Sequence, residues 1–248
     1  MEWKGCGMLV SQSVSISVSG RTILDGASFS LASGEVVGLV APNGHGKTLF
    51  MKSLANAHAS RRGAVIAYAE VSADGIRPTD GDAYRKHVLY LPAGREFLYP
   101  QMTVIDHLQF IGASWGTSDD IGRVVDECCI DEMLNLRVRR LSDGMAQQVA
   151  LAAAYLTGAR YLLLDEPMNA LDHGHVELHH AILRELAETG RGILLSSHLL
   201  DDISRVCDRT LYMKDGSLVE GADLARHLSV EQLYECLYEE EGDERGNS

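Results

Sequence analysis

The segment Ala41–Thr48 reads Ala-Pro-Asn-Gly-His-Gly-Lys-Thr, with small residues ahead of a lysine and a hydroxyl. Backbone N–H groups of such a loop can wrap a β-phosphate, while the lysine reaches the β and γ oxygens and the hydroxyl holds Mg²⁺. The pattern usually begins with Gly, and Ala41 is the smallest change that adds a Cβ atom. The sequence therefore predicts an ATP·Mg²⁺ site whose nucleotide-binding residues are Asn43, Gly44, His45, Gly46, Lys47 and Thr48.

A second group of reactive side chains follows the apolar run Tyr161–Leu164, where Asp165 and Glu166 stand side by side. Phosphoryl transfer needs charge neutralisation and a positioned nucleophile more than covalent chemistry. We expect Asp165 to join Thr48 at Mg²⁺ and Glu166 to orient the attacking water. His198 follows another apolar run and is a candidate contact for the γ-phosphate.

These groups need elements that bring them together. Short runs without polar alternation, at 36–40, 88–91, 161–164 and 193–195, fit central strands of a parallel sheet. Helical patterns at 49–55, 145–156 and 176–187 separate them. Since ligands of open α/β sheets lie beyond the carboxyl ends of the strands, the three polar clusters should converge there.

The remaining patterns complete an α/β fold with a mostly parallel sheet. Alternation around Val14–Val18, with Phe29 and Leu31, predicts a small N-terminal antiparallel β subdomain. Helical patterns at 104–110 and 124–133, with no strand between 94 and 140, predict an inserted helical subdomain spanning about 94–150. The main domain is expected over 1–224, followed over 225–248 by a short helix and an acidic, disordered tail.

Composition narrows the class of protein. The 248 residues carry a net charge of −13, from 22 basic and 35 acidic side chains, which argues against a nucleic-acid partner. Five cysteines without a CxxC pair suit a reducing compartment. No apolar run reaches the roughly 18–20 residues of a membrane helix. We therefore expect a cytoplasmic protein that could touch a membrane only through a partner.

In this order, the motifs resemble the nucleotide-binding domain of ABC ATPases, over about residues 8–222. Leu141-Ser142-Asp143-Gly144-Met145 is similar to the family signature LSGGQ, and Asn169–Asp172 to its D-loop. The resemblance implies a P-loop NTPase core and a head-to-tail dimer that sandwiches two ATP molecules. It assigns Ser142 and Gly144 to the partner's ATP, Asp172 to the D-loop and His198 to the switch histidine, although Ser142 could simply cap a helix.

Three departures from the family pattern bear on activity. Asp143 puts a carboxylate where the signature has a small residue. Ala93 stands where the family has a glutamine that touches Mg²⁺ and the membrane partner. Val18 stands where an aromatic side chain usually stacks on adenine, and Trp3 or Tyr68 could replace it.

The resemblance thus implies the ATP-hydrolysing subunit of an ABC transporter, which energises export or import at the cytoplasmic face of a membrane. It would pair with a second ATPase subunit and with integral membrane subunits. Two alternatives are a soluble, non-transport ABC ATPase and a weakly hydrolysing subunit of a heterodimer.

His175 and His179, spaced i, i+4, could hold a metal, although a solvated helix face is the better interpretation.

Overall fold

The computed structural model describes residues 7–55, 64–67, 70–225 and 227–238. A first, antiparallel sheet has β1 in its middle, paired with β2 along one edge and with β4 and β5 along the other. Its strands are β1 (Met8–Val18), β2 (Arg21–Ala32), β4 (Ala64–Ala67) and β5 (Glu70–Ala73). This is the predicted N-terminal antiparallel unit.

The second sheet has six strands in the order β10-β9-β3-β8-β7-β6, and every neighbouring pair except β10-β9 is parallel. The prediction of an α/β fold with a mostly parallel sheet is confirmed. The strands are β3 (Val36–Val40), β6 (Val88–Leu91), β7 (Tyr161–Asp165), β8 (Gly192–Ser196), β9 (Arg209–Lys214) and β10 (Ser217–Glu220).

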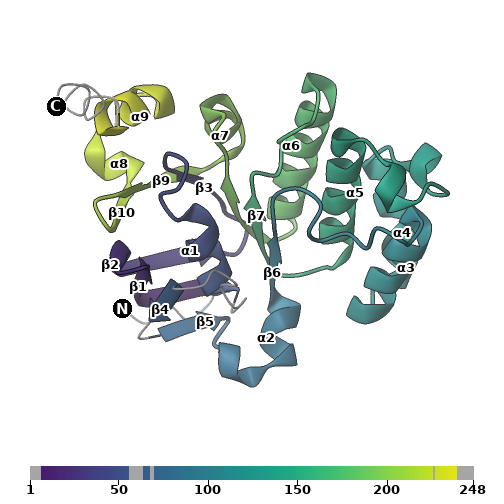
Figure 1. The fold of residues 1–248 in the computed structure, drawn as a ribbon, viewed down its shortest axis with the longest axis horizontal. Coiled ribbons are helices and arrows are strands. Elements are labelled where there is room, and N and C mark those ends of the chain that lie inside the picture. The colour runs from purple at the N-terminus through teal and green to yellow at the C-terminus, as the bar shows by residue number, and fades with distance from the viewer. Residues whose placement is uncertain (1–6, 56–63, 68–69, 226, 239–248) are drawn as a thin grey trace.

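Helices α3, α4 and α5 gather at the end of the molecule opposite the antiparallel sheet, while α8 and α9 lie beside β9 and β10 (Figure 1). The inserted helices follow β6 and precede β7, as the sequence predicts. The helices are α1 (Lys47–Leu54), α2 (Asp82–His87), α3 (Val104–Trp115), α4 (Ile121–Glu127), α5 (Asp143–Leu156), α6 (His173–Glu188), α7 (Leu200–Val206), α8 (Gly221–Leu224) and α9 (Val230–Tyr238).

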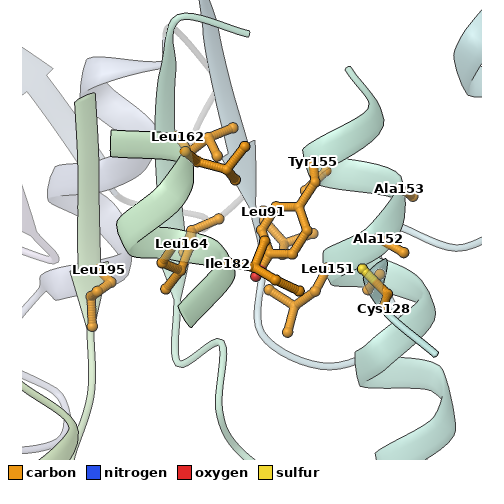
Figure 2. Close-up of a cluster of buried hydrophobic side chains, with 14 of the residues drawn as sticks. Leu91, Cys128, Leu151, Ala152, Ala153, Tyr155, Leu162, Leu164, Ile182 and Leu195 are labelled. Atoms are coloured by element: carbon orange, nitrogen blue, oxygen red, sulfur yellow. The ribbon is translucent and has the colours of Figure 1, made fainter. Parts of the chain in front are cut away.

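The parallel sheet is buried on both faces because successive side chains of a strand point to opposite sides. On β7, Leu163 faces the core shared with α1 and the antiparallel sheet, whereas Leu162 and Leu164 face the core shared with α5 and α6. Figure 2 shows part of the second core, in which α5 packs through small and apolar side chains. The cluster includes Leu91, Cys128, Leu151, Ala152, Ala153, Tyr155, Leu162, Leu164, Ile182 and Leu195.

Two expectations about elements were wrong or incomplete. The helix expected over 124–133 ends at Glu127, because the chain reverses at Cys129, whose φ is +53°, and buries Ile130. The hairpin of β9 and β10 was not predicted. Its strands mix charged and apolar residues, although the Asp215-Gly216 pair between them is a hairpin signal.

The C-terminal helix α9 packs onto the main fold, with Leu233 buried in the same core as α5. The expected acidic tail, residues 239–248, lies outside the described residues, and the domain boundaries at 224 and 225 stay a prediction. Within the described ranges, no helix is both long and apolar enough to cross a membrane.

Stability should fall on acidification because of a buried histidine in α6. His179 is fully buried and shares a hydrogen bond of 3.2 Å with the Tyr155 hydroxyl, and burial lowers its pKa to about 4. In the unfolded chain this imidazole has a pKa of 6.5. Between pH 6.5 and pH 4 the unfolded chain therefore binds a proton that the folded chain does not bind. The stability present at pH 7 is lost as pH falls through this window. The expected loss from this group at pH 5 is about 2 kcal/mol.

Urea unfolding at pH 7 and pH 5 measures this effect. The variant His179→Gln should show a smaller drop in unfolding free energy between the two pH values than the unchanged protein. The variant His173→Gln, at an exposed position of the same helix, serves as the matched control and should keep the full drop. An identical drop in all three proteins would remove His179 from the explanation.

Candidate nucleotide site

The loop between β3 and α1 has the backbone that phosphate wrapping needs. Gly44 and Gly46 adopt φ values of +83° and +97°, and a Cβ on Gly46 would lie 2.2 Å from the Ile23 side chain. Ala41 does not adopt a positive φ and is buried, which explains why a Cβ is tolerated there. Asn43, Gly44 and His45 are exposed, so the loop is open to a ligand.

Lys47 opens α1 and lies at the base of this loop. Its side chain is only 7% exposed, and Nζ donates a hydrogen bond of 2.6 Å to the carbonyl of Ala41. Burial lowers the pKa of Lys47, and the carboxylates of Glu166 and Asp165 oppose that shift. The ammonium is therefore desolvated and only partly neutralised, which makes it a strong partner for an incoming anion.

Asp165 ends β7 and is held by three hydroxyl groups. The Thr48 Oγ1 donates to Asp165 Oδ2 at 2.6 Å, and the Tyr90 hydroxyl donates to the same oxygen at 3.0 Å. On the other side, Ser196 Oγ donates to Asp165 Oδ1 at 2.8 Å. Burial and the neighbouring Asp165 raise the pKa of Tyr90, so its hydroxyl stays a donor. The carboxylate is thereby fixed in orientation next to Thr48.

The oxygens of Thr48 and Asp165 fit a magnesium site. Both are hard ligands of the kind that Mg²⁺ prefers, and they come from helix α1 and strand β7, so rigid elements position them. Asp165 is 4% exposed, and Lys47 is the nearby cation. A divalent ion here would bring positive charge next to the phosphate-binding loop.

Glu166 points toward both Lys47 and His198. One of its carboxylate oxygens lies 3.9 Å from Lys47 Nζ, and the other lies 2.8 Å from His198 Nδ1 and accepts the His198 backbone N–H at 3.1 Å. Its backbone is strained, with φ +50° immediately before Pro167. Strain of this kind is concentrated at functional sites, and here it orients a carboxylate that is 13% exposed.

The signature-like residues lie elsewhere. Ser142 caps α5 by accepting the Met145 N–H at 3.2 Å, and α5 is separated from α1 by β6 and β7 in Figure 1. No hydrogen bond between described residues joins Ser142 or Gly144 to the loop at 41–48. The structure thus brings Lys47, Thr48, Asp165, Glu166 and His198 together and leaves Ser142, Gly144 and Asp172 outside that group.

Gly144 packs against the segment at 169–172, which the sequence predicts to be the D-loop. A Cβ on Gly144 would lie 2.7 Å from the carbonyl oxygen of Ala170, whose own φ is +67°. Gln147 of α5 donates to the carbonyl of Pro167 at 2.8 Å. Asp172 caps α6 by accepting the His175 N–H at 3.1 Å. The start of α5 is therefore in direct contact with the segment that follows Glu166.

Asp143 has a partner that the sequence did not reveal. Arg95 donates to the Asp143 carboxylate at 2.9 Å and to the carbonyls of Leu141 at 2.6 Å and Val138 at 3.3 Å. The guanidinium comes from the segment after β6, two residues beyond Ala93. The extra negative charge of the signature-like segment is thus matched by a cation from the segment that lacks the expected glutamine.

The histidine cluster does not form a metal site. His175 pairs with the Asp172 carboxylate at 2.7 Å, whereas His179 points into the core toward Tyr155. Among the described residues, no group of three or more His, Cys, Asp or Glu side chains could hold an ion. Trp3 and Tyr68, the candidate replacements for the stacking aromatic, lie outside the described residues.

Sequence reasoning missed Tyr90 and Arg95 as parts of the site. Tyr90 lies inside the run 88–91, which reads as core. Ser196 belongs to the polar cluster that follows the run 193–195, but its hydrogen bond to Asp165 was not predicted. Arg95 carried no signal, because its partner lies 48 positions away in the sequence.

Comparison with known proteins gives consistent matches. The family model described as ABC transporter matches residues 24–169. An uncharacterized ABC transporter ATP-binding protein of Methanocaldococcus jannaschii is 32% identical over 204 residues, covering 80% of this chain and 71% of the relative. Nod factor export ATP-binding protein I of Paraburkholderia xenovorans is 31% identical, covering 83% of this chain and 67% of the relative.

The fold is also similar to a solved structure titled "Structure of ATP binding subunit of ABC transporter". The two share 27% sequence identity with a TM-score of 0.82, over 93% of this chain and 99% of that one. Since the match covers nearly the whole chain, the likeness extends beyond the phosphate-binding loop.

Proposed function

The chain belongs to the ABC transporter family of ATP-binding proteins, and on this premise we propose that it hydrolyses ATP to drive export or import by separate membrane subunits. The observation that carries the proposal is the group formed by Lys47, Thr48, Asp165, Glu166 and His198, in which hydrogen bonds join Thr48 to Asp165 and His198 to Glu166, and an ion pair joins Lys47 to Glu166. These are the charges and ligands that phosphoryl transfer requires, at the ends of adjacent strands.

In the proposed reaction, the loop's N–H groups and the Lys47 ammonium bind the β- and γ-phosphates. Thr48 and Asp165 would hold Mg²⁺, which when bound neutralises charge on the phosphate oxygens. Tyr90 and Ser196 keep the Asp165 carboxylate in one orientation, so the ligand geometry is set before nucleotide arrives.

Glu166 is the group that would position the attacking water. Its hydrogen bonds with the backbone and ring of His198 fix the carboxylate, and the His198 side chain remains 49% exposed, so it is open to a ligand. Glu166 would orient the water, which would attack the γ-phosphorus in line with the leaving oxygen. His198 would then contact the γ-phosphate and couple its presence to Glu166.

We propose further that two ATPase subunits form a head-to-tail dimer. The N-terminus of α5, a 14-residue helix capped by Ser142, is a natural anion site that no residue of the same chain's loop reaches. In the dimer this end would face the partner's ATP through Ser142 and Gly144. Asp172 would lie in the D-loop at the interface.

The Arg95–Asp143 pair predicts a specific activity defect. Arg95→Ala is expected to lower the ATPase rate about tenfold, because the uncompensated Asp143 carboxylate would repel the partner's γ-phosphate. The cost in stability should be small, about 1 kcal/mol at most, since Asp143 is 84% exposed.

The double variant Arg95→Ala/Asp143→Gly provides the matched control, because it removes the repelling charge together with its partner. Steady-state phosphate release should recover at least partly in this variant. If the single and double variants lose the same activity, repulsion by Asp143 is not the cause.

An exposed aromatic pair on the inserted helical region is a candidate contact site for the membrane partner. Tyr99 and Phe110 form an edge-to-face pair 5.5 Å apart on the inserted helical region, and they are 51% and 44% exposed. Exposed aromatic pairs of this kind are typical of protein contact sites. The proposal puts the protein at the cytoplasmic face of the membrane, held there by integral transporter subunits that cover this pair.

Detergent extraction from native membranes tests that assignment. The tagged protein is expected to co-purify with a polytopic membrane protein, and Tyr99→Ser/Phe110→Ser should lose that partner while keeping its ATPase rate. Val65→Ser, which alters a 62% exposed apolar residue on β4, is the control and should retain the partner. A purely soluble complex would favour the alternative of a non-transport ABC ATPase.

A weakly hydrolysing subunit is the remaining alternative, motivated by Ala93, Asp143 and Val18. The Arg95 contact to Asp143 and the intact Glu166–His198 pair favour turnover over simple binding.

A further inference from the structure

A cavity of about 390 Å³ opens beside the phosphate-binding loop, on the side away from Glu166. This volume lies in the range of roughly 300–1,000 Å³ that is common for small-molecule sites. Its lining combines two residues of the loop, the start of β2, the turn between β9 and β10, and one aromatic residue of α9. These are Arg21, Thr22, Ile23, Asp25, Gly44, His45, Lys214, Asp215, Gly216 and Tyr238.

The order of strands fixes which end of a nucleotide would face this cavity. The loop follows β3, and the strands on one side of it, β8 and β7, end near His198 and Glu166. The strands on the other side, β9 and β10, form the cavity with α9. A nucleotide with its γ-phosphate at Glu166 therefore extends across the loop toward the cavity.

Hydrogen bonds hold the aromatic wall of the cavity in place. The Tyr238 hydroxyl donates to the carbonyl of Met213 at 2.8 Å, and Lys214 Nζ donates to the carbonyl of Leu237 at 2.7 Å, so the end of α9 is tied to the end of β9. The Tyr238 ring lies 6.2 Å from the His45 ring, at an interplanar angle of 65°. Two π-systems thus border the cavity at a fixed separation.

We propose that the purine base of the bound nucleotide packs in this cavity against His45 and Tyr238. The inference rests on the proposed function, because it concerns the base of the same ATP. Base packing on an aromatic ring contributes substantially to affinity and tolerates many geometries. Val18, at the position where the family resemblance leads one to expect a stacking aromatic, packs against the core of the antiparallel sheet instead.

The assignment gives the C-terminal helix a role in nucleotide recognition. Tyr238 belongs to α9, and its contact with the base would link nucleotide binding to the docking of that helix on β9. His45, on the loop itself, would contact the base from the phosphate side.

Comparison of ATP with inorganic triphosphate, each with Mg²⁺, separates base contacts from phosphate contacts. By equilibrium titration, Tyr238→Ala should weaken ATP binding about tenfold and leave triphosphate affinity unchanged. His45→Ala should act in the same direction. Tyr238→Phe keeps the ring and should bind ATP within about threefold of the unchanged protein, which controls for loss of fold in the alanine variant.

The possible results are distinct. Unchanged ATP affinity in Tyr238→Ala, or equal losses for ATP and triphosphate, would overturn the base assignment while leaving the phosphate site intact. Failure of the unchanged protein to bind either ligand would overturn the proposed function as well. Photolabelling with 8-azido-ATP gives a second readout, since label should reach the peptides that contain His45 or Tyr238. Label confined to Trp3 or Tyr68 would overturn the assignment.

Discussion

Replacement of Lys47 by alanine is expected to weaken ATP binding at least 100-fold. The ammonium is almost fully buried at the base of the loop, it lies 3.9 Å from the Glu166 carboxylate, and it interacts electrostatically with Asp165. Without it, the triphosphate would lose charge-assisted hydrogen bonds worth about 1.5–3 kcal/mol each and would face those carboxylates unshielded. Titration with ATP·Mg²⁺, followed by calorimetry, measures the loss.

Two further proteins make the Lys47 result interpretable. Lys47→Arg keeps the charge but changes its reach, and it should bind ATP more tightly than Lys47→Ala. Lys52→Ala removes a lysine from the same helix that lies over the Tyr90 ring, and it should bind normally. An affinity for Lys47→Ala within threefold of the unchanged protein would contradict the assignment of the loop.

Replacement of Glu166 by glutamine is expected to lower the ATPase rate at least 100-fold while ATP affinity stays the same or rises. Glutamine keeps the size of the side chain and can still accept from the His198 backbone N–H. It removes the negative charge that would orient and polarise the water, which affects the transition state more than the bound substrate. The variant should therefore accumulate as an ATP-bound dimer, visible by sedimentation with Mg²⁺.

The control for this substitution is Glu185→Gln, the same charge change at an exposed position of α6. It should leave both the rate and the monomer population unchanged. A Glu166→Gln protein that binds ATP but never dimerises would contradict the shared site between subunits.

The parts of the site that could be predicted from sequence are local. The loop Ala41–Thr48 and the Asp165-Glu166 pair each follow a continuous apolar run, and such runs mark buried parallel strands. The convergence of these segments then follows from the rule that ligands lie beyond the carboxyl ends of strands. Helix α5 and its Ser142 cap are likewise local features.

The parts that could not be predicted depend on contacts between distant segments. Arg95 and Asp143 show no spacing that would pair them. Their contact nevertheless places a guanidinium beside the Asp143 carboxylate, which departs from the family signature. Tyr238 reaches the loop only because α9 docks on β9, a strand whose mixed sequence gave little signal. The chain leaves the helix before Cys129, whose φ is positive, and Ile130 behind it is buried in a core that the helical pattern did not reveal.

Phosphate release from ATP·Mg²⁺ is the most direct measurement of the central claim. The purified protein and Glu166→Gln should be assayed side by side, at protein concentrations that allow dimers to form. The account predicts steady release by the unchanged protein and less than about one hundredth of that rate in Glu166→Gln, with ATP bound by both. Equal rates in the two proteins would contradict the assignment of Glu166 and of hydrolysis to this site.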